Sequence, residues 1–172
     1  EQKGTGHAVK MCFDNLKDLS GDVLILSGDV PLISIKTLES LIDSKKRSKA
    51  QAAILTATMN DPSGYGRVIK KNGMLHNIVE HKDCNEKELA VNEINAGIYL
   101  IDIQSLRKYI PRIGNKNKQS EYYLPDVFNF MIKDSLEIAV HNIANTTEIS
   151  GINNKEQLLE LSNYLKENEE SK

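Results

Sequence analysis

Asp29 is the residue whose type and position in this sequence most clearly suggest chemistry. It follows the continuous apolar run Val23 to Leu26, which is typical of a parallel strand covered by helices on both faces. Pro31 prevents that strand from continuing, so we predict Asp29 at the carboxyl end of an interior strand, where open α/β sheets bind ligands. A carboxylate held there suits Mg²⁺ in front of a phosphate group. The alternative is an ordinary turn, in which the Asp29 side chain only accepts a hydrogen bond from a backbone N–H.

Two further polar residues lie in or near predicted strands. Glu80 opens the sequence EHKD, in which Glu80 and Asp83 flank His81 and could act as general acid and base. Such a mixed-charge tetrad is also typical of a solvated charge cluster. We favour a third interpretation, in which Glu80 accepts hydrogen bonds from substrate hydroxyl groups. Asn95 offers both a donor and an acceptor, which suits the binding of a sugar.

Two glycine-containing turns could bring the backbone close to a ligand. Gly4-Thr5-Gly6 leads into a short predicted helix, and its N–H groups could contact a ligand. A plain loop-to-helix turn is the simpler interpretation of this tripeptide. Residues 60–66, which read NDPSGYG, are the densest turn signal in the chain, and the glycines on either side of Tyr65 permit close approach to a bound group.

Asn153 and Asn154 precede the last predicted helix, and their roles are open. Asn153 with Glu156, and Asn154 with Gln157, each have the spacing of a capping box. An amide oxygen that coordinates a metal is not free to cap a helix. One of the two asparagines could therefore cap the helix while the other coordinates a cation.

The composition and the absence of certain motifs exclude several classes of function. The chain has 172 residues, of which 27% are charged, and a formal net charge of −2, so it lacks the basic excess that nucleic-acid binding requires. No apolar run approaches the roughly 18 residues of a membrane span. Cys12 and Cys84 stand outside any CxxC or Cys/His cluster, which argues against a zinc site or a disulfide framework and favours a reducing, cytoplasmic setting. Neither a P-loop nor a G-x-S-x-G elbow is present.

An α/β fold has to position these residues. The apolar periodicities predict strands over 23–26, 52–59, 67–70, 75–80, 92–101 and 137–143. They predict helices after residue 6, from residue 35 with Ser34 as its N-cap, and over 103–110, 124–132 and 158–165. Asn72-Gly73 marks a β-hairpin, and residues 84–88 read as an exposed loop. The chain thus begins with a parallel β-α-β unit and continues into antiparallel strands.

Seven segments occur in an order that resembles a known family. They are GTGHAV, LSGDVPLI, DPSGYGRV, IVEHKD, NEINAGIY, SEYYLPD and GINN, and they span the chain from Gly4 to about Leu165. This order resembles the uridyltransferase domain of the bacterial bifunctional N-acetylglucosamine-1-phosphate uridyltransferases and glucosamine-1-phosphate acetyltransferases. The EHKD and NEINxG segments are quite specific within sugar nucleotidyltransferases.

The resemblance implies a Rossmann-like nucleotidyltransferase fold, with a mostly parallel mixed sheet flanked by helices and a small antiparallel lobe over about 64–101. It implies that residues 1–166 are a partial uridyltransferase domain ending in a linker helix over about 154–166, with 167–172 as a frayed tail. The family's first strand and its glycine-rich loop, whose arginine and lysine contact the triphosphate, are missing from this chain. The β-helix that performs acetyl transfer is missing as well, so no acetyltransferase activity is expected.

The resemblance also implies roles for individual residues. The residues expected to contact the nucleotide are Gly4, Thr5, Ser27, Gly28 and Asp29, with Ser27 standing where the family usually has tyrosine. Those expected to bind N-acetylglucosamine are Gly66, Glu80, Asn95 and Asn153. Asp29, the catalytic residue, and Asn153 are expected to hold Mg²⁺.

The implied reaction is Mg²⁺-dependent attack of N-acetylglucosamine 1-phosphate on the α-phosphate of UTP, which gives UDP-N-acetylglucosamine and pyrophosphate. This product serves peptidoglycan and lipopolysaccharide synthesis, and the family's full-length members are homo-oligomers. One alternative is a truncated, non-catalytic fragment that binds a sugar nucleotide. Another is a structural or assembly role, which rests on the amphipathic terminal helix.

Overall fold

A computed structural model describes residues 2–16, 18–152 and 154–169 of the chain. Its strands are β1 (Asp22–Ile25), β2 (Ala52–Thr58), β3 (Arg67–Lys71), β4 (Met74–Val79), β5 (Glu93–Asp102) and β6 (Ile138–Ile143). Its α-helices are α1 (Thr5–Met11), α2 (Phe13–Leu16), α3 (Ile35–Ser48), α4 (Glu86–Leu89), α5 (Ile103–Tyr109), α6 (Pro125–Lys133) and α7 (Lys155–Glu169). Short 3₁₀ turns are η1 (His81–Asp83), η2 (Ile110–Arg112) and η3 (Thr146–Ile149).

One mixed sheet contains all the described strands, in the order β4-β3-β5-β2-β6, with β1 also paired to β5. The long strand β5 pairs antiparallel with β2 along one edge, and its other edge is shared by β1 and β3. Among the described pairs, only β2 with β6 is parallel. The predicted mixed α/β sheet flanked by helices is confirmed, and its antiparallel part includes the hairpin of β3 and β4. The expectation that the sheet is mostly parallel is wrong, because the other described pairs are antiparallel.

The prediction for β1 is wrong in its pairing and its burial. We expected an interior parallel strand, whereas β1 pairs antiparallel with β5 and its residues are exposed or half-buried. Both β1 and β2 run antiparallel to β5, so they share the direction that a β-α-β unit requires, but β5 lies between them. The strand that is buried on both faces is β2, whose first six residues are all buried.

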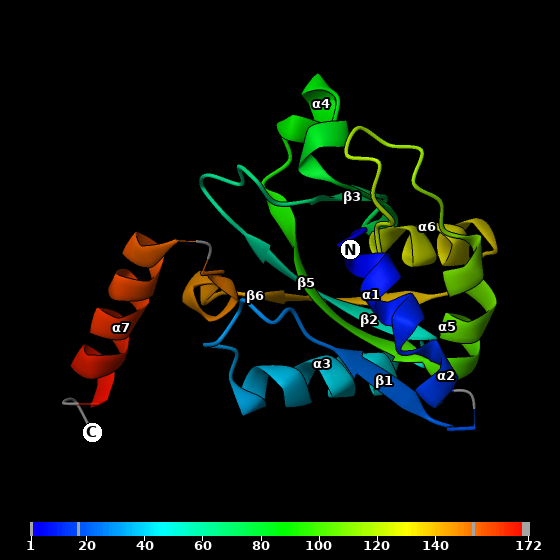
Figure 1. Ribbon diagram of the computed structural model, residues 1–172, viewed down its shortest axis with the longest axis horizontal. Coiled ribbons are helices and arrows are strands. Elements are labelled where there is room, and N and C mark those ends of the chain that lie inside the picture. The colour runs from blue at the N-terminus through cyan, green and yellow to red at the C-terminus, as the bar shows by residue number, and fades with distance from the viewer. Residues whose placement is uncertain (1, 17, 153, 170–172) are drawn as a thin grey trace.

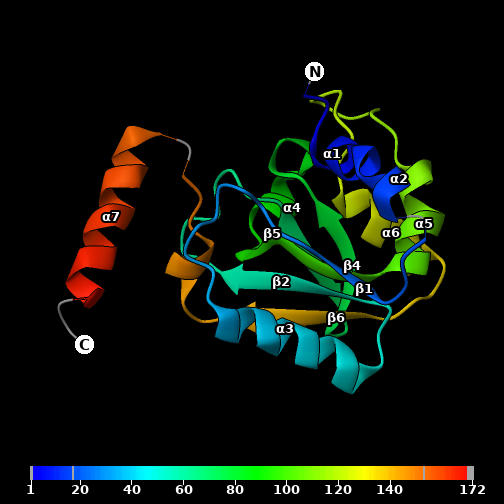
Figure 2. The same cartoon turned by 60° about the horizontal axis from the view of Figure 1, so that its bottom comes forward.

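Helices cover both faces of the sheet (Figure 2). On one face α3 packs Leu41 against a cluster that includes Leu55 and Ile98. On the other face α5 and α6 supply Leu106 and Phe128 to a second cluster, and α1 and α2 border it with half-buried side chains. These two clusters fix the position of β5, the strand that carries Asn95.

Several local predictions are confirmed. The side chain of Ser34 accepts a hydrogen bond from the Thr37 N–H and caps α3. Asn72 and Gly73 both have positive φ, at 52° and 79°, as a two-residue hairpin turn requires.

The expectation of an exposed loop over 84–88 is wrong, because Cys84 is buried and Asn85 begins α4 through a capping box with Glu88. The N-x-x-E spacing of Asn85 and Glu88 is the sequence signal for this capping box.

The last helix, α7, stands apart from the body of the domain (Figure 1). It extends to Glu169, beyond the predicted end near residue 166, and the remainder of the predicted tail, 170–172, lies outside the described residues. Leu161 is buried, whereas Leu158 and Leu165 are about half exposed. None of the described helices is both long and apolar enough to cross a membrane.

The N-cap of α3 is expected to contribute measurably to stability. The Glu148 carboxylate accepts hydrogen bonds from the Ser34 N–H and the Thr37 hydroxyl, at 3.1 and 2.6 Å, so the cap also holds η3 against α3. Ser34→Ala should lower the free energy of unfolding by about 1 kcal/mol, measured by urea denaturation. Ser40→Ala, within the same helix, is the control and should change stability little, because the Ser40 hydroxyl bonds only to the Lys36 carbonyl of its own helix. Equal losses in both variants would contradict this role of the cap.

Candidate functional site

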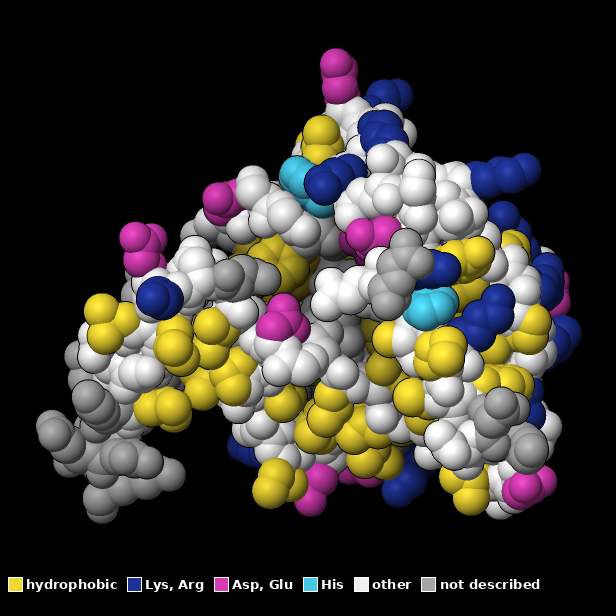
Figure 3. Space-filling model, in the orientation of Figure 1, with side chains coloured by type: hydrophobic (Ala, Val, Ile, Leu, Met, Phe, Trp, Pro, Cys, Tyr) yellow, Lys and Arg dark blue, Asp and Glu magenta, His cyan; other side chains and the backbone are white. Residues whose placement is uncertain are grey.

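A cavity of about 900 Å³ lies beside β1 and is lined by the loop after that strand, the turn at residues 63–66, β5 and α1. Figure 3 shows apolar side chains gathered around β1 on the face toward the viewer. The apolar part of the cavity wall includes Val9 and Leu16 from α1 and α2 and Val23 and Ile25 from β1. The polar groups of the wall are concentrated at the ends of β1 and β4 and in the first half of β5.

Most of the site residues predicted from the sequence line this one cavity. They are Thr5, Ser27, Gly28, Asp29, Gly66, Glu80 and Asn95. Gly4 is not among the lining residues, and Asn153 lies outside the described residues. The chain therefore brings the expected nucleotide-contacting segment and the expected sugar-contacting residues to a common space.

Asp29 is exposed within a turn that follows the edge strand β1, not at the end of an interior strand. Its backbone carbonyl accepts a hydrogen bond of 2.9 Å from the Ile152 N–H. That bond ties the turn to the segment just before the asparagine pair. Asn154 is committed to α7, because its side-chain oxygen accepts a hydrogen bond of 2.8 Å from the Gln157 N–H. Asn154 is thus the capping residue of the pair.

Ser27 connects β1 to β5. Its hydroxyl donates a hydrogen bond of 3.1 Å to the Gly97 carbonyl. Gly97 has a φ of 73°, and a Cβ added there would lie 2.6 Å from the Ser27 Oγ. A side chain at position 97 would therefore clash with Ser27, which explains glycine at this point of β5.

Gly66, Glu80 and Asn95 are immediate neighbours. The Gly66 carbonyl accepts a hydrogen bond of 2.9 Å from the Asn95 N–H. A Cβ added to Gly66 would lie 3.4 Å from the Glu80 Oε2 and 3.6 Å from the Asn95 Cβ. The absence of a side chain at Gly66 leaves the carboxylate and the amide accessible from the cavity.

Glu80 is held at the boundary between two cavities. The Asn129 side chain bonds both the N–H and the carbonyl of Ile78, each at 2.9 Å, which anchors the end of β4 two residues before Glu80. A smaller cavity of about 430 Å³ lies on the other side of Glu80 and contains Asp83 and Asp126 in its wall. Burial raises the pKa of Glu80, and the nearby carboxylates of Asp126, Asp83 and Glu121 raise it further.

The Gly4-Thr5-Gly6 turn packs against the segment around Tyr122. The Gly6 N–H donates to the Tyr122 carbonyl at 2.8 Å, and a Cβ added to Gly4 would lie 2.7 Å from the same oxygen. The Thr5 hydroxyl accepts a hydrogen bond of 3.1 Å from the Leu124 N–H. Close approach of two backbone segments is sufficient to explain the glycines, which supports the simpler interpretation of this turn.

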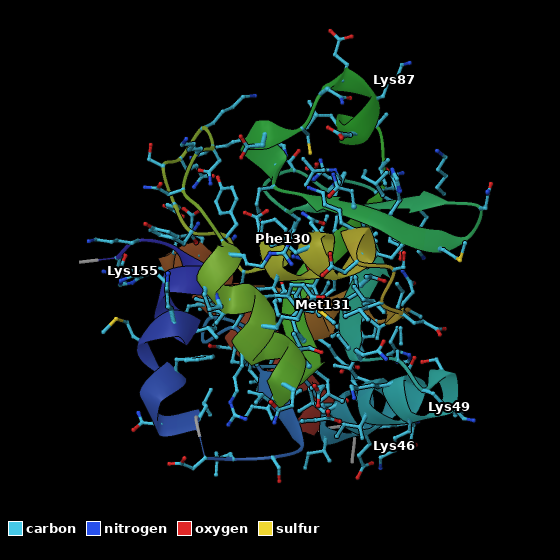
Figure 4. The ribbon with its side chains drawn as sticks, turned by 90° about the vertical axis from the view of Figure 1, so that its right-hand side faces the viewer. Lys46, Lys49, Lys87, Phe130, Met131 and Lys155 are labelled. Carbon is cyan, nitrogen blue, oxygen red and sulfur yellow. The ribbon has the colours of Figure 1, made fainter. Side chains whose placement is uncertain are left out.

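The cavity holds little positive charge of its own. No lysine or arginine is among its lining residues in the described part of the chain. Lys46 and Lys49 lie at the carboxyl end of α3, as Figure 4 shows, and both are exposed. The described residues also contain no group of three or more His, Cys, Asp or Glu side chains that could hold a metal ion. A cation at Asp29 would therefore need further oxygen ligands from a bound phosphate or from water.

Tyr99 is a cavity residue that the sequence patterns did not identify. It lines the cavity and its hydroxyl accepts a hydrogen bond of 2.7 Å from the Asn95 side-chain amide. A tyrosine four residues after an asparagine is no motif in a regular strand. The signal available in the sequence was Gly97 between them, because a glycine inside a strand suggests a bulge.

Known proteins similar to this chain are nucleotidyl transferases. A family described as nucleotidyl transferase matches residues 1–142. The bifunctional protein GlmU of Clostridium beijerinckii is 45% identical over 166 residues, which are 96% of this chain and 36% of that protein. GlmU of Staphylococcus carnosus is 42% identical over 156 residues, which are 90% of this chain and 34% of that protein. The resemblance seen in the motifs is confirmed, and the chain spans about a third of the length of these curated relatives.

Solved structures confirm the fold class. A Bacillus anthracis protein that bears the name of a glucose-1-phosphate thymidylyltransferase has a TM-score of 0.64 at 19% identity, over 84% of this chain and 54% of that chain. A nucleoside-diphosphate-sugar pyrophosphorylase from Vibrio cholerae RC9 has a TM-score of 0.59 at 15% identity, over 86% of this chain and 60% of that chain.

The raised pKa of Glu80 predicts a pH dependence of stability. The folded-state pKa of Glu80 lies above the ordinary value of 4.5. The contribution of Glu80 to the free energy of unfolding is therefore fully present below pH 4.5 and is lost as the pH rises through the raised pKa. Glu80→Gln removes this loss. The melting temperature of the variant relative to wild type should therefore increase between about pH 4 and about pH 7.

Thermal unfolding at a series of pH values measures this difference. Glu39→Gln, which removes an exposed carboxylate from α3, is the control and should differ from wild type by a nearly constant amount. A Glu80→Gln difference that stays constant or shrinks with rising pH would show that the folded-state pKa is not raised.

Proposed function

This chain belongs to the nucleotidyl transferase family, and from that premise we propose that it transfers the uridylyl group of UTP to N-acetylglucosamine 1-phosphate. The products are UDP-N-acetylglucosamine and pyrophosphate. The observation that carries the proposal is the single cavity whose wall includes the Ser27-Gly28-Asp29 turn together with Gly66, Glu80 and Asn95. Such a wall suits a ligand with phosphates at one end and a sugar at the other.

In this reaction the phosphate of the sugar 1-phosphate attacks the α-phosphorus of UTP in line with the departing pyrophosphate. The protein has little covalent chemistry to perform, so its main contribution is to position two anionic substrates. Glu80 accepts hydrogen bonds from sugar hydroxyl groups, and the Asn95 amide both donates and accepts. Gly66 leaves room for the sugar beside these two side chains.

Asp29 would hold Mg²⁺ together with phosphate oxygens of the nucleotide, and Asn153 is the second expected ligand. The exposed carboxylate of Asp29 in the cavity wall is a hard oxygen ligand of the kind that Mg²⁺ prefers. When bound, the ion supplies compensation for the charge of the phosphates. This contribution matters here because no basic side chain is among the described lining residues.

That same lack of basic side chains supports a second candidate, a domain that binds the sugar nucleotide without catalysing its synthesis. Charge compensation at a transferring phosphoryl group is usually a large part of the rate enhancement. Release of pyrophosphate from UTP and N-acetylglucosamine 1-phosphate by this chain distinguishes the two candidates. Binding of UDP-N-acetylglucosamine without pyrophosphate release favours the binding domain.

Asp29→Ala tests the cation-dependent part of the proposal. In the presence of Mg²⁺ the variant should bind UDP-N-acetylglucosamine about tenfold to a hundredfold more weakly than wild type, because it loses a charged contact worth about 1.5–3 kcal/mol. Isothermal titration calorimetry measures the dissociation constants. Chelation of Mg²⁺ should reduce wild-type affinity to the level of the variant and leave the variant unchanged.

Asp43→Ala is the matched control, since it removes an exposed aspartate from α3 that does not line the cavity. It should bind as wild type does under both conditions. Equal affinity of wild type and Asp29→Ala in Mg²⁺ would refute the metal role of Asp29.

A further inference from the structure

The amide of Asn95 has a fixed orientation in the cavity wall. Its Nδ2 donates to the Tyr99 hydroxyl at 2.7 Å, and its Oδ1 lies 3.5 Å from the Gly97 N–H. Asn95 and Tyr99 are buried, with 7% and 3% of their surfaces exposed. Because a backbone N–H can only donate, the Gly97 N–H identifies Oδ1 as the end of the amide that faces it, and the Tyr99 hydroxyl then holds Nδ2 on the other side. The second lone pair of Oδ1 is left for a ligand.

This contact exists because β5 is bulged. In a regular strand, residues four apart are about 13 Å apart, at 3.3 Å per residue. Along β2 the partners of Tyr99 and Asn95 are Ile54 and Thr56, so a two-residue step on β2 faces a four-residue step on β5. The chain turns at Gly97 with positive φ, which shortens β5 locally and allows the two side chains to meet.

The Tyr99 ring is held rigidly behind the amide. It stacks on Phe128 of α6, with ring centroids 4.8 Å apart and an interplanar angle of 29°. Phe128 is fully buried. The packing of the core therefore sets the position of the hydroxyl.

We infer that Tyr99 is a positioning residue for the sugar end of the cavity, which it serves by orienting the Asn95 amide so that its oxygen accepts a hydrogen bond from an N–H or O–H of the sugar. This inference rests on the proposed function and adds to it a residue to which the family resemblance gave no role. Burial raises the pKa of Tyr99, and the nearby Glu80 charge raises it further. The hydroxyl therefore stays protonated while it accepts the bond from Asn95.

Tyr99→Phe removes only the hydroxyl and retains the ring that stacks on Phe128. The dissociation constant for UDP-N-acetylglucosamine with Mg²⁺ should rise about threefold to tenfold, the range of one hydrogen bond. The dissociation constant for UTP, which has no sugar at that end, should not change. Calorimetry with the two ligands measures this split, which a general loss of structure would not produce.

Tyr109→Phe is the matched control. Tyr109 is also fully buried, and its hydroxyl donates to Asp134 at 2.8 Å, away from the cavity. This variant should lose stability without changing the ratio of the two dissociation constants. A double-mutant cycle adds a second test, because Tyr99→Phe should have no further effect on sugar-nucleotide binding in an Asn95→Ala background.

Each outcome decides one proposal. If wild type binds neither ligand, the proposed function fails and the sugar-positioning role fails with it. If wild type binds both and Tyr99→Phe changes neither dissociation constant, or changes both equally, the inference about Tyr99 alone is overturned. A further effect of Tyr99→Phe in the Asn95→Ala background would also overturn it, because Tyr99 would then act by a route other than the amide.

Discussion

The bulge of β5 at Gly97 is the constraint on which the arrangement of the site depends. β5 pairs with β2 along one edge, while its other edge accepts β1 near residues 99–102 and β3 at Ile94. A regular strand would carry Asn95 and Tyr99 on the same face but far apart. The positive φ of Gly97 brings their side chains together, and the Ser27 hydroxyl bonds to the backbone at the same point.

The charge distribution around the cavity follows from the same arrangement. Glu80 follows β4, the hairpin strand that α6 anchors through Asn129, and it lies close enough to Asp83 and Asp126 for their charges to raise its pKa. Carboxylates therefore surround the end expected to take the sugar. At the end expected to take the phosphates, the described lining residues include Asp29 but no lysine or arginine.

Features set by neighbouring residues could be predicted from the sequence. The Ser34 cap, the Asn72-Gly73 turn and the amphipathic helix α6 each depend on side chains within a few positions. The pairing of β1 could not be predicted, because its partner β5 begins about 70 residues later and an apolar run does not specify direction. The capping box of α4 was readable from Asn85 and Glu88, but the polar composition suggested a loop.

The sequence alone determined the α/β class, the order of its elements and the family, because ordered motifs such as SGDVPLI and NEINAG need no tertiary information. It also nominated Asp29, Gly66, Glu80 and Asn95. Only the tertiary structure decided that these four residues line one cavity and that Tyr99 holds the Asn95 amide. These relations depend on strand pairing and on a backbone bulge, which bring together residues that no local pattern connects.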